Sequence, residues 1–364
     1  MVRVGNTIDR VFLFYVIVIT IFGLGALTSA SGPLAYGKFH DSYFFIKRQI
    51  VFGLIPGVVI AYFFSKIDFE KWKKFSWLPY LISIFLLVLV FIPGVGAVIN
   101  GARSWISILG FNFQPSEIAK LGLIIFAAYL LSDHKRNLDD WQMGLLPILT
   151  LLAPIILLVL LQPDIGTLSI MLVILFGMLF EAKVPKKYLA VLGGAALLAF
   201  VFLVFLKPYR LERITIFMHP ELDPKGIGYQ VNQAFLAVGS GGFWGLGIGQ
   251  SRQKFQYLPE VNSDSIFAII AEETGFMVST ALIVLILLIG LRGLKIAKNS
   301  NSEFGRLLAV GIVIWLVWQS FLNIGAMVGA LPLTGVPLPF VSHGGSAMMA
   351  ELAAVGLILN ISKR

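Results

Sequence analysis

Between Gln253 and Gly275 the chain reads QKFQYLPEVNSDSIFAIIAEETG, a polar loop that runs into an apolar helix and leaves Asp264 at the boundary. An ionisable side chain is costly to place in lipid, so a residue in this position is a candidate for function. The rest of the chain brings further polar residues to the ends of other apolar runs. This stretch is therefore the centre of the predicted fold.

The composition is that of an integral membrane protein. Of 364 residues, 58% are hydrophobic and 13% are charged, and the mean hydropathy is +0.88, which leaves too little polar surface for a water-soluble globule. The chain contains no cysteine, which excludes disulfides and thiolate metal sites. The formal net charge of +9 is explained by where the basic residues fall around the membrane, and no nucleic-acid partner is expected.

Ten apolar runs are long enough to cross the hydrocarbon core, which takes about 20 helical residues. They cover residues 11–30, 45–65, 78–99, 115–131, 143–161, 165–180, 188–206, 264–291, 307–330 and 342–361. The first run is longer than the core of a secretory signal and no clear cleavage site follows it, so it counts as a span. The predicted fold class is all-α: a single polytopic membrane domain, 1–364, with about ten transmembrane helices and one long extracytoplasmic loop, 207–263, between helices seven and eight.

The basic residues of the short loops set the orientation of these spans. If the N-terminus is cytoplasmic, the inner segments hold seventeen Lys and Arg residues and the short outer loops hold four. The inner ones are Arg3, Arg10, Lys66, Lys71, Lys73, Lys74, Lys135, Arg136, Lys183, Lys186, Lys187, Arg292, Lys295, Lys298, Arg306, Lys363 and Arg364, and the outer ones are Lys38, Lys47, Arg48 and Arg103. Both termini are therefore predicted to be cytoplasmic.

The outer loop 207–263 is too long to be a plain connection, and its many aromatic residues argue against disorder. Its glycine-rich segment 239–249 reads GSGGFWGLGIG. No strand precedes this segment, which excludes a dinucleotide-binding motif. Close backbone packing or a re-entrant turn is the favoured interpretation, and backbone contact with a pyrophosphate is the alternative.

Spans four, six, eight and ten begin with polar motifs: QPSEIAK at 114–120, QPDIGT at 162–167, NSD at 262–264, and PLTGVPLPF at 332–340 followed by SHGGS at 342–346. These four spans run from outside to inside, so their polar ends are predicted to cluster at the outer face. The predicted layer comprises Asn100, Arg103, Glu117, Lys120, Asp164, Asp264 and Ser342. A carboxylate at a helix N-terminus faces the positive end of the helix dipole, which favours its ionised form.

Plainer interpretations stay open for each residue. Glu117 and Lys120 share a helix face and can simply neutralise each other, and Asp164 and Asp264 can be helix caps. His343 suits a packed interfacial residue better than a metal ligand. The basic residues Arg210, Arg213, Arg252 and Lys254 are either solvated surface or ligands of a phosphate-bearing lipid head group.

The motifs together resemble the SEDS family (shape, elongation, division and sporulation). The resemblance is carried by NGARSWI at 100–106, the four motifs above, and YLPEVNSD at 257–264 with Glu272 and Glu273, and it spans nearly the whole chain. Segment 245–255, GLGIGQSRQKF, is closer to the FtsW branch than to the RodA branch. The chain departs from the family pattern at Asn262-Ser263, where His-Thr is usual, at Ser265, where Phe is usual, and at His343, where Tyr is common, so the histidine that precedes the aspartate in the family is replaced by asparagine.

The resemblance implies a peptidoglycan glycosyltransferase that polymerises lipid II at the outer face of the bacterial cytoplasmic membrane. Its donor is an undecaprenyl-diphosphate-linked glycan, and the reaction inverts the sugar stereochemistry without a covalent intermediate. Asp264 matches the essential aspartate of the family, with the role of general base. Glu117, Lys120, Asp164 and, more weakly, Arg103 match positions that shape the cavity or contact the diphosphate.

Further ligands and partners are implied in the same way. Ser342 and Ser346 fall in the motif of the tenth span and are included as cavity residues. A divalent cation, Mg²⁺ or Mn²⁺, is expected, with Asp264, Asp164 and Glu117 as candidate ligands, and no organic cofactor. The expected protein partner is a class B penicillin-binding protein that contacts spans eight and nine. The competing hypotheses are a flippase or transporter of the lipid-linked precursor and a non-catalytic scaffold for a transpeptidase.

Overall fold

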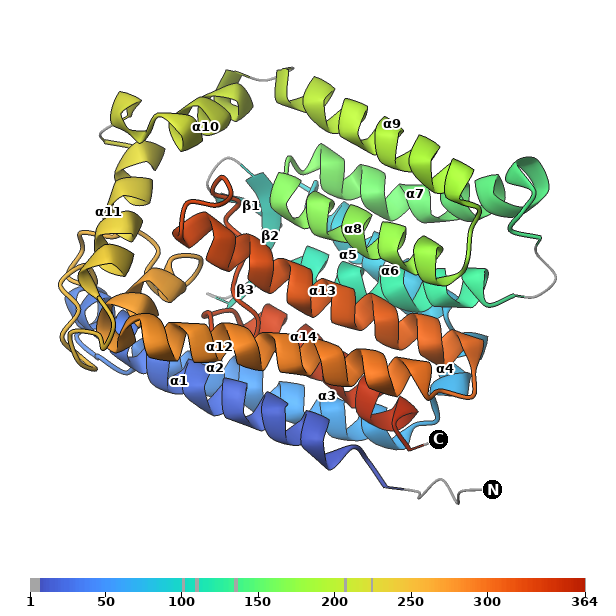
Figure 1. Cartoon of the computed structure of the whole chain (residues 1–364), viewed down its shortest axis with the longest axis horizontal. Helices are drawn as coiled ribbons and strands as arrows, with labels where there is room; N and C mark the ends of the chain where they lie inside the picture. The colour runs from blue at the N-terminus through green and yellow to red at the C-terminus, as the bar shows by residue number, and fades with distance from the viewer. Residues whose placement is uncertain are drawn as a thin grey trace.

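The computed structural model describes residues 7–99, 102–108, 111–133, 137–205, 208–223 and 225–363, and each predicted span coincides with a helix or a run of helices (Figure 1). In chain order these are α1 (Arg10–Phe39); α2 (Phe44–Gln49), η1 (Ile50–Leu54) and α3 (Ile55–Lys66) as one run; α5 (Trp77–Leu89); α6 (Pro115–Leu131); η2 (Trp141–Leu145) with α7 (Leu146–Leu161); α8 (Ile165–Glu181); α9 (Lys186–Phe205); α12 (Ile266–Lys298); α13 (Glu303–Met327); and α14 (Gly345–Ile361). Five of the described helices or runs are long and apolar enough to cross a membrane. The prediction of an all-α, polytopic membrane fold is confirmed.

The predicted third span, 78–99, is wrong in its second half. Helix α5 ends at Leu89, and the chain then forms a small antiparallel sheet of β1 (Gly96–Ile99), β2 (Ala102–Ile108) and β3 (Phe111–Phe113) in that order. Pro93 has no N–H group, and Gly94 has a φ of 85°. Both features end a helix.

The helices form one bundle (Figure 1), in which α6, α13 and α14 are the most buried. Helix α14 packs against α3 and α6, while α13 packs against α12, α8 and α6. The two chain termini and the short helix α4 (Phe69–Lys74) lie at one end of the bundle, and the segment that connects α9 to α12 lies at the other end.

That segment is largely helical rather than disordered. It contains α10 (Pro208–Met218), the short η3 (Pro220–Leu222) and α11 (Ile227–Ser240), and α11 packs against α12 and α13. After α11 the chain makes a series of turns and reaches α12 at Ile266. This segment between α9 and α12, which was predicted to lie on the outer side of the membrane and is called the outer segment below, therefore forms a structured cover over the N-terminal end of α12.

Helix α12 is interrupted at Gly275, where φ is 71° and ψ is −172°, a conformation that favours glycine. The break frees backbone groups that lipid cannot hydrogen-bond. The glycine-rich segment 239–249 supplies the partners: two of its N–H groups donate to the carbonyls of Glu272 and Glu273 at 3.0 and 2.9 Å, and one of its carbonyls accepts from the N–H of Phe276 at 2.9 Å. This agrees with the interpretation of the segment as a site of close backbone packing.

Candidate functional site

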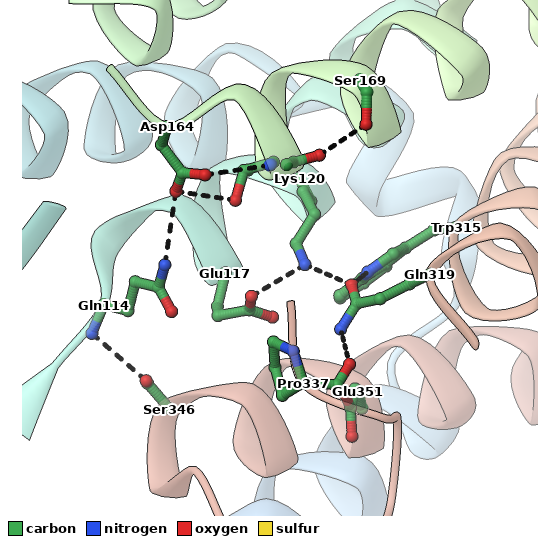
Figure 2. Close-up of polar contacts among 12 residues, drawn as sticks. Gln114, Glu117, Lys120, Asp164, Ser169, Trp315, Gln319, Pro337, Ser346 and Glu351 are labelled. Carbon is green, nitrogen blue, oxygen red and sulfur yellow. Dashed lines mark hydrogen bonds and ion pairs between the residues drawn. The ribbon is translucent and has the colours of Figure 1, made fainter. Parts of the chain in front are cut away.

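The N-terminal ends of α6, α8, α12 and α14 meet at the end of the bundle covered by the outer segment. Gln114, just before α6, donates its backbone N–H to Ser346 Oγ of α14 at 3.2 Å and its side-chain Nε2 to Asp164 Oδ2 at 3.5 Å (Figure 2). Ser342 Oγ donates to the backbone carbonyl of Ser263, just before α12, at 2.6 Å. The predicted convergence of these four helix ends is therefore confirmed.

Asp164 is the N-cap residue of α8. Its Oδ1 accepts from the backbone N–H of Thr167 at 3.0 Å, and its Oδ2 accepts from the Thr167 hydroxyl at 2.8 Å (Figure 2). These bonds satisfy part of the first turn of the helix. The interpretation of Asp164 as a cap is confirmed, and its contact with Gln114 connects the cap to the neighbouring helix end.

A proline-rich segment, 332–340, connects α13 to α14 and borders both aspartates. A Cβ on Gly166, in the first turn of α8, would approach the carbonyl oxygen of Thr334 to 2.9 Å. A Cβ on Gly335 would stand 3.9 Å from Asp264 Oδ2. The cap of α8 and the loop that carries Asp264 are thus held against the same short segment.

Asp264 is not a helix cap, because the N-cap of α12 is Ser265. The side chain is half-buried, and its Oδ1 is buried without a hydrogen-bond partner among the described residues. Burial, followed by the negative charge of Glu260, raises the pKa of Asp264 to about 7, while hydrogen bonds from backbone N–H groups and the positive charge of Arg213 oppose the shift. The expectation that the helix dipole would favour the ionised form is wrong, because burial outweighs it.

Glu117 and Lys120 form a buried ion pair on α6. The distance from Lys120 Nζ to Glu117 Oε1 is 2.8 Å, and both side chains are at most 2% exposed. Lys120 Nζ also donates to Gln319 Oε1 of α13 at 2.6 Å and lies 4.9 Å from the centre of the Trp315 ring (Figure 2). The self-neutralising interpretation of this pair agrees with the geometry, and its position in the bundle makes it a cross-link between α6 and α13.

The remaining predicted basic residues are not brought to one place. Arg213 of α10 acts electrostatically on Asp264, where its positive charge lowers the pKa of the aspartate, and it donates to the carbonyl of Leu333 at 3.4 Å. Lys254 is buried and forms an ion pair with Glu273 at 2.7 Å. The proposed phosphate contact of Lys254 would require breaking that pair.

Two of the other predicted basic side chains are exposed, and the third lies outside the described residues. The Arg252 side chain is exposed, and so is that of Arg103 on β2. The side chain of Arg210 and the whole of Asn100 lie outside the described residues, so their predicted places are not tested. Among the predicted cations whose side chains are described, Arg213 is the one that acts electrostatically on Asp264.

His343 is a packed residue. Its ring meets that of Phe45 edge-on at 5.2 Å between centroids, and its backbone N–H donates to the carbonyl of Asn262 at 2.8 Å. Burial, with the positive charge of Arg48, lowers the pKa of His343 to about 4. The neutral, packed interpretation of His343 therefore agrees with the geometry.

Comparison with known proteins places this arrangement in a family. The model of the FtsW, RodA and SpoVE family, described as "Cell cycle protein", matches residues 9–364. Stage V sporulation protein E of Bacillus subtilis is 42% identical over 355 residues, which cover 98% of this chain and 97% of that protein. A probable peptidoglycan glycosyltransferase FtsW of Geobacter sp. is 40% identical over 358 residues, 98% of this chain and 97% of that protein. The chain belongs to the SEDS family, close to FtsW.

Solved structures of SEDS proteins have the same fold. A chain from the structure of a peptidoglycan synthase complex that coordinates polymerization and crosslinking is 30% identical, with a TM-score of 0.79, and the match covers 98% of this chain and 97% of that one. The crystal structure of the rod shape determining protein RodA of Thermus thermophilus is 28% identical, with a TM-score of 0.71 and 98% and 96% of the two chains covered. The resemblance predicted from the motifs is therefore confirmed.

Three buried polar residues of this SEDS site were missed by sequence reasoning. Gln319 and Asn323 lie one turn apart on α13, and Glu351 lies on α14 with its Oε2 accepting from the N–H of Phe340 at 2.9 Å. Each one interrupts an apolar run, which is the signal that could have found it. None stands in a motif at the start of a span, where the polar groups were sought.

The three predicted metal ligands do not form a protein metal site. Among the residues that the structure describes, no three His, Cys, Asp or Glu side chains gather to hold an ion. Glu117 is paired with Lys120, and Asp164 is occupied as a cap. Asp264 Oδ1 and Glu117 Oε2 both lack a hydrogen-bond partner among the described residues, but Glu117 is buried against the Lys120 ammonium and Asp264 is not.

Proposed function

We propose that this chain is a peptidoglycan glycosyltransferase that polymerises lipid II, with Asp264 as the general base. The observation that carries the proposal is the unpartnered, buried Oδ1 of Asp264, on a carboxyl group whose pKa is about 7. A general base works best when its pKa is near the working pH. The curated FtsW relatives named as probable peptidoglycan glycosyltransferases support the reaction class.

The reaction is a single displacement with inversion. Asp264 takes the proton from the 4-hydroxyl of the acceptor sugar, and that oxygen forms a bond to the anomeric carbon of the donor. The bond from the anomeric carbon to the diphosphate oxygen breaks, and the electron pair leaves with the undecaprenyl diphosphate. One base suffices, which distinguishes this site from the paired carboxylates of glycoside hydrolases.

The other charged groups of the site have different proposed roles. Arg213 is the described cation whose charge acts on the aspartate, so it is the residue we assign to the negative charge of the leaving diphosphate. Glu117, Lys120 and Asp164 hold the helix ends together, and in this proposal they shape the cavity. Lys254 anchors the outer segment through Glu273.

A divalent cation fits only as a companion of the substrate. Mg²⁺ commonly binds through one or two carboxylates together with substrate phosphate oxygens, and Asp264 Oδ1 is the unpartnered carboxylate oxygen among the predicted ligands that has no lysine ammonium paired with its carboxyl group. The cation would supply neutralisation of the diphosphate charge. The residues described here would not hold it in the absence of that diphosphate.

The proposed setting is the cytoplasmic membrane with both termini inside. The two termini lie together at one end of the bundle and α10 and α11 at the other (Figure 1), which matches the charge distribution of the loops. A class B penicillin-binding protein is the proposed partner, and the outward faces of α12 and α13 are the proposed contact. The structural relative in a peptidoglycan synthase complex supports this assignment.

The test is polymerisation of lipid II by the purified chain with its partner, in Mg²⁺ or Mn²⁺. Glycan strands should form with the natural chain and not with Asp264→Asn or Asp264→Ala. The variants should keep their unfolding temperature and partner binding. Full polymerisation by Asp264→Ala would refute Asp264 as the general base. Absence of strands with the natural chain would favour the scaffold, and transport of lipid II without strand formation would favour the flippase.

A further inference from the structure

A buried amide on α13 holds the backbone of Asp264. Asn323 is 2% exposed, and its Nδ2 donates to the carbonyl of Asp264 at 2.8 Å and to the carbonyl of Val336 at 2.9 Å. One side chain thus joins the loop before α12 to the proline-rich segment 332–340. Both hydrogens of the amide are used in this way.

The two preceding residues are held in the same manner. The carbonyl of Asn262 accepts from the N–H of His343 at 2.8 Å, and the carbonyl of Ser263 accepts from Ser342 Oγ at 2.6 Å. Three consecutive carbonyls are therefore fixed by donors from elsewhere in the fold. Asn323 binds the last of the three, which belongs to the aspartate itself.

A second amide extends the connection to the buried ion pair. Gln319, one turn before Asn323, donates its Nε2 to the carbonyl of Pro337 at 2.9 Å, while its Oε1 accepts from Lys120 Nζ at 2.6 Å (Figure 2). The two amides thus bind consecutive carbonyls of segment 332–340. The hydrogen bonds therefore fix the position of the segment, and of the backbone of Asp264, relative to α13.

The amide of Asn323 makes its described hydrogen bonds through its nitrogen and none through its oxygen. Asn323 Oδ1 is buried without a hydrogen-bond partner among the described residues, a situation that destabilises the folded protein. An amide present only for stability would be expected to use both ends, as Asn360 does. Asn360 Nδ2 donates to Ser65 O at 2.6 Å and its Oδ1 accepts from Phe69 N at 2.9 Å.

We propose that Asn323 is a positioning residue for the general base: it fixes the backbone of Asp264 so that the unpartnered Oδ1 is aimed at the acceptor hydroxyl. The inference rests on the proposed function of Asp264. Oδ1 has no hydrogen-bond partner among the described residues, and the carboxylate accepts from the backbone N–H groups of Asp264 and Ser265, so its direction depends on that backbone. Glu260 and Arg213 are the charged groups that influence this carboxylate most.

The test compares Asn323→Ala with the matched control Asn360→Ala, which removes a buried asparagine from the opposite end of the bundle. Asn323→Ala should lower kcat for lipid II polymerisation about 100-fold, the scale of a displacement of about 1 Å, with little change in KM. The pH midpoint of the rate should fall below its natural value near 7, because the released carboxyl group gains water. Asn360→Ala should lower the unfolding temperature and leave kcat per folded molecule and the pH midpoint unchanged.

Asn323→Asp, of nearly equal size, covers the case in which Asn323→Ala does not fold. It removes the donors and adds a negative charge near Asp264, so the pH midpoint should rise. Natural kcat and midpoint in a folded Asn323 variant, together with an inactive Asp264→Asn, would overturn this inference alone. Natural activity in Asp264→Asn would instead overturn the proposed function.

Discussion

Glu117 and Asp264 are both acidic residues near the start of a membrane-spanning helix, but their charges are treated in opposite ways. Glu117 has a lysine 2.8 Å away within the same helix. Each carboxyl group keeps one oxygen without a hydrogen-bond partner among the described residues, but Asp264 forms no described ion pair and meets its described cation, Arg213, only through a weaker electrostatic interaction. A carboxylate that is already neutralised contributes to the fold, whereas one that is left without a partner is available for proton transfer.

The largest expected effect comes from removing the unpartnered carboxylate. Asp264→Asn should lower the rate of polymerisation by about 10²–10⁴-fold, the usual contribution of a general base. It should not lower the unfolding temperature, because no described side-chain bond is lost. Rate and thermal unfolding measured on the same preparation check this. A variant that loses its rate only because it unfolds would place Asp264 with Glu117 in a structural role.

Breaking the paired carboxylate should mainly affect stability. Lys120→Met leaves Glu117 buried without a counter-charge, which should cost about 3–5 kcal/mol in the free energy of unfolding. The double variant Glu117→Gln with Lys120→Met should recover most of that loss. The measurement is denaturant unfolding in detergent. If Lys120→Met stays as stable as the natural chain but loses its polymerisation activity, the pair acts on the substrate.

The cap of α8 should have a smaller effect. Asp164→Ala should destabilise the protein by about 1 kcal/mol, the usual cost of a lost N-cap, and Asp164→Asn should restore most of it because asparagine caps equally well. Polymerisation by the folded fraction should change by only a few-fold. A loss comparable to that of Asp264→Asn would show that Asp164 contacts the substrate instead.

The smallest effect concerns pH. The general base acts in its ionised form, so the rate should rise as pH increases through about 7, the pKa of Asp264. Because this pKa is raised above its unfolded value, the folded state binds the proton more tightly and stability should decline between about pH 4 and 7. Glu260→Gln removes a negative charge and should move the rate midpoint to lower pH. A midpoint that does not respond would exclude Asp264 as the titrating group.

Much of the fold was predictable because apolar length dictates membrane helices. The alternation of span direction also predicted that Glu117, Asp164 and Asp264 would come to one end. Sequence could not show that Lys254 pairs with Glu273 or that Asn323 binds the Asp264 carbonyl, because both contacts join segments that only the fold brings together. The sheet was missed because apolar residues continue past Leu89, although Pro93 and Gly94 signal the end of the helix.

Because α12 is interrupted at Gly275, the glycine-rich segment 239–249 holds the two halves of the helix together through backbone hydrogen bonds. Since the carbonyls of Glu272 and Glu273 depend on N–H groups of 239–249, deleting one residue from that segment would shift the register of both halves of the helix. Trp244 and Ile248, at 75% and 80% exposure, protrude from the same joint. A partner surface that binds these two side chains would therefore also restrict the angle between the two halves of α12.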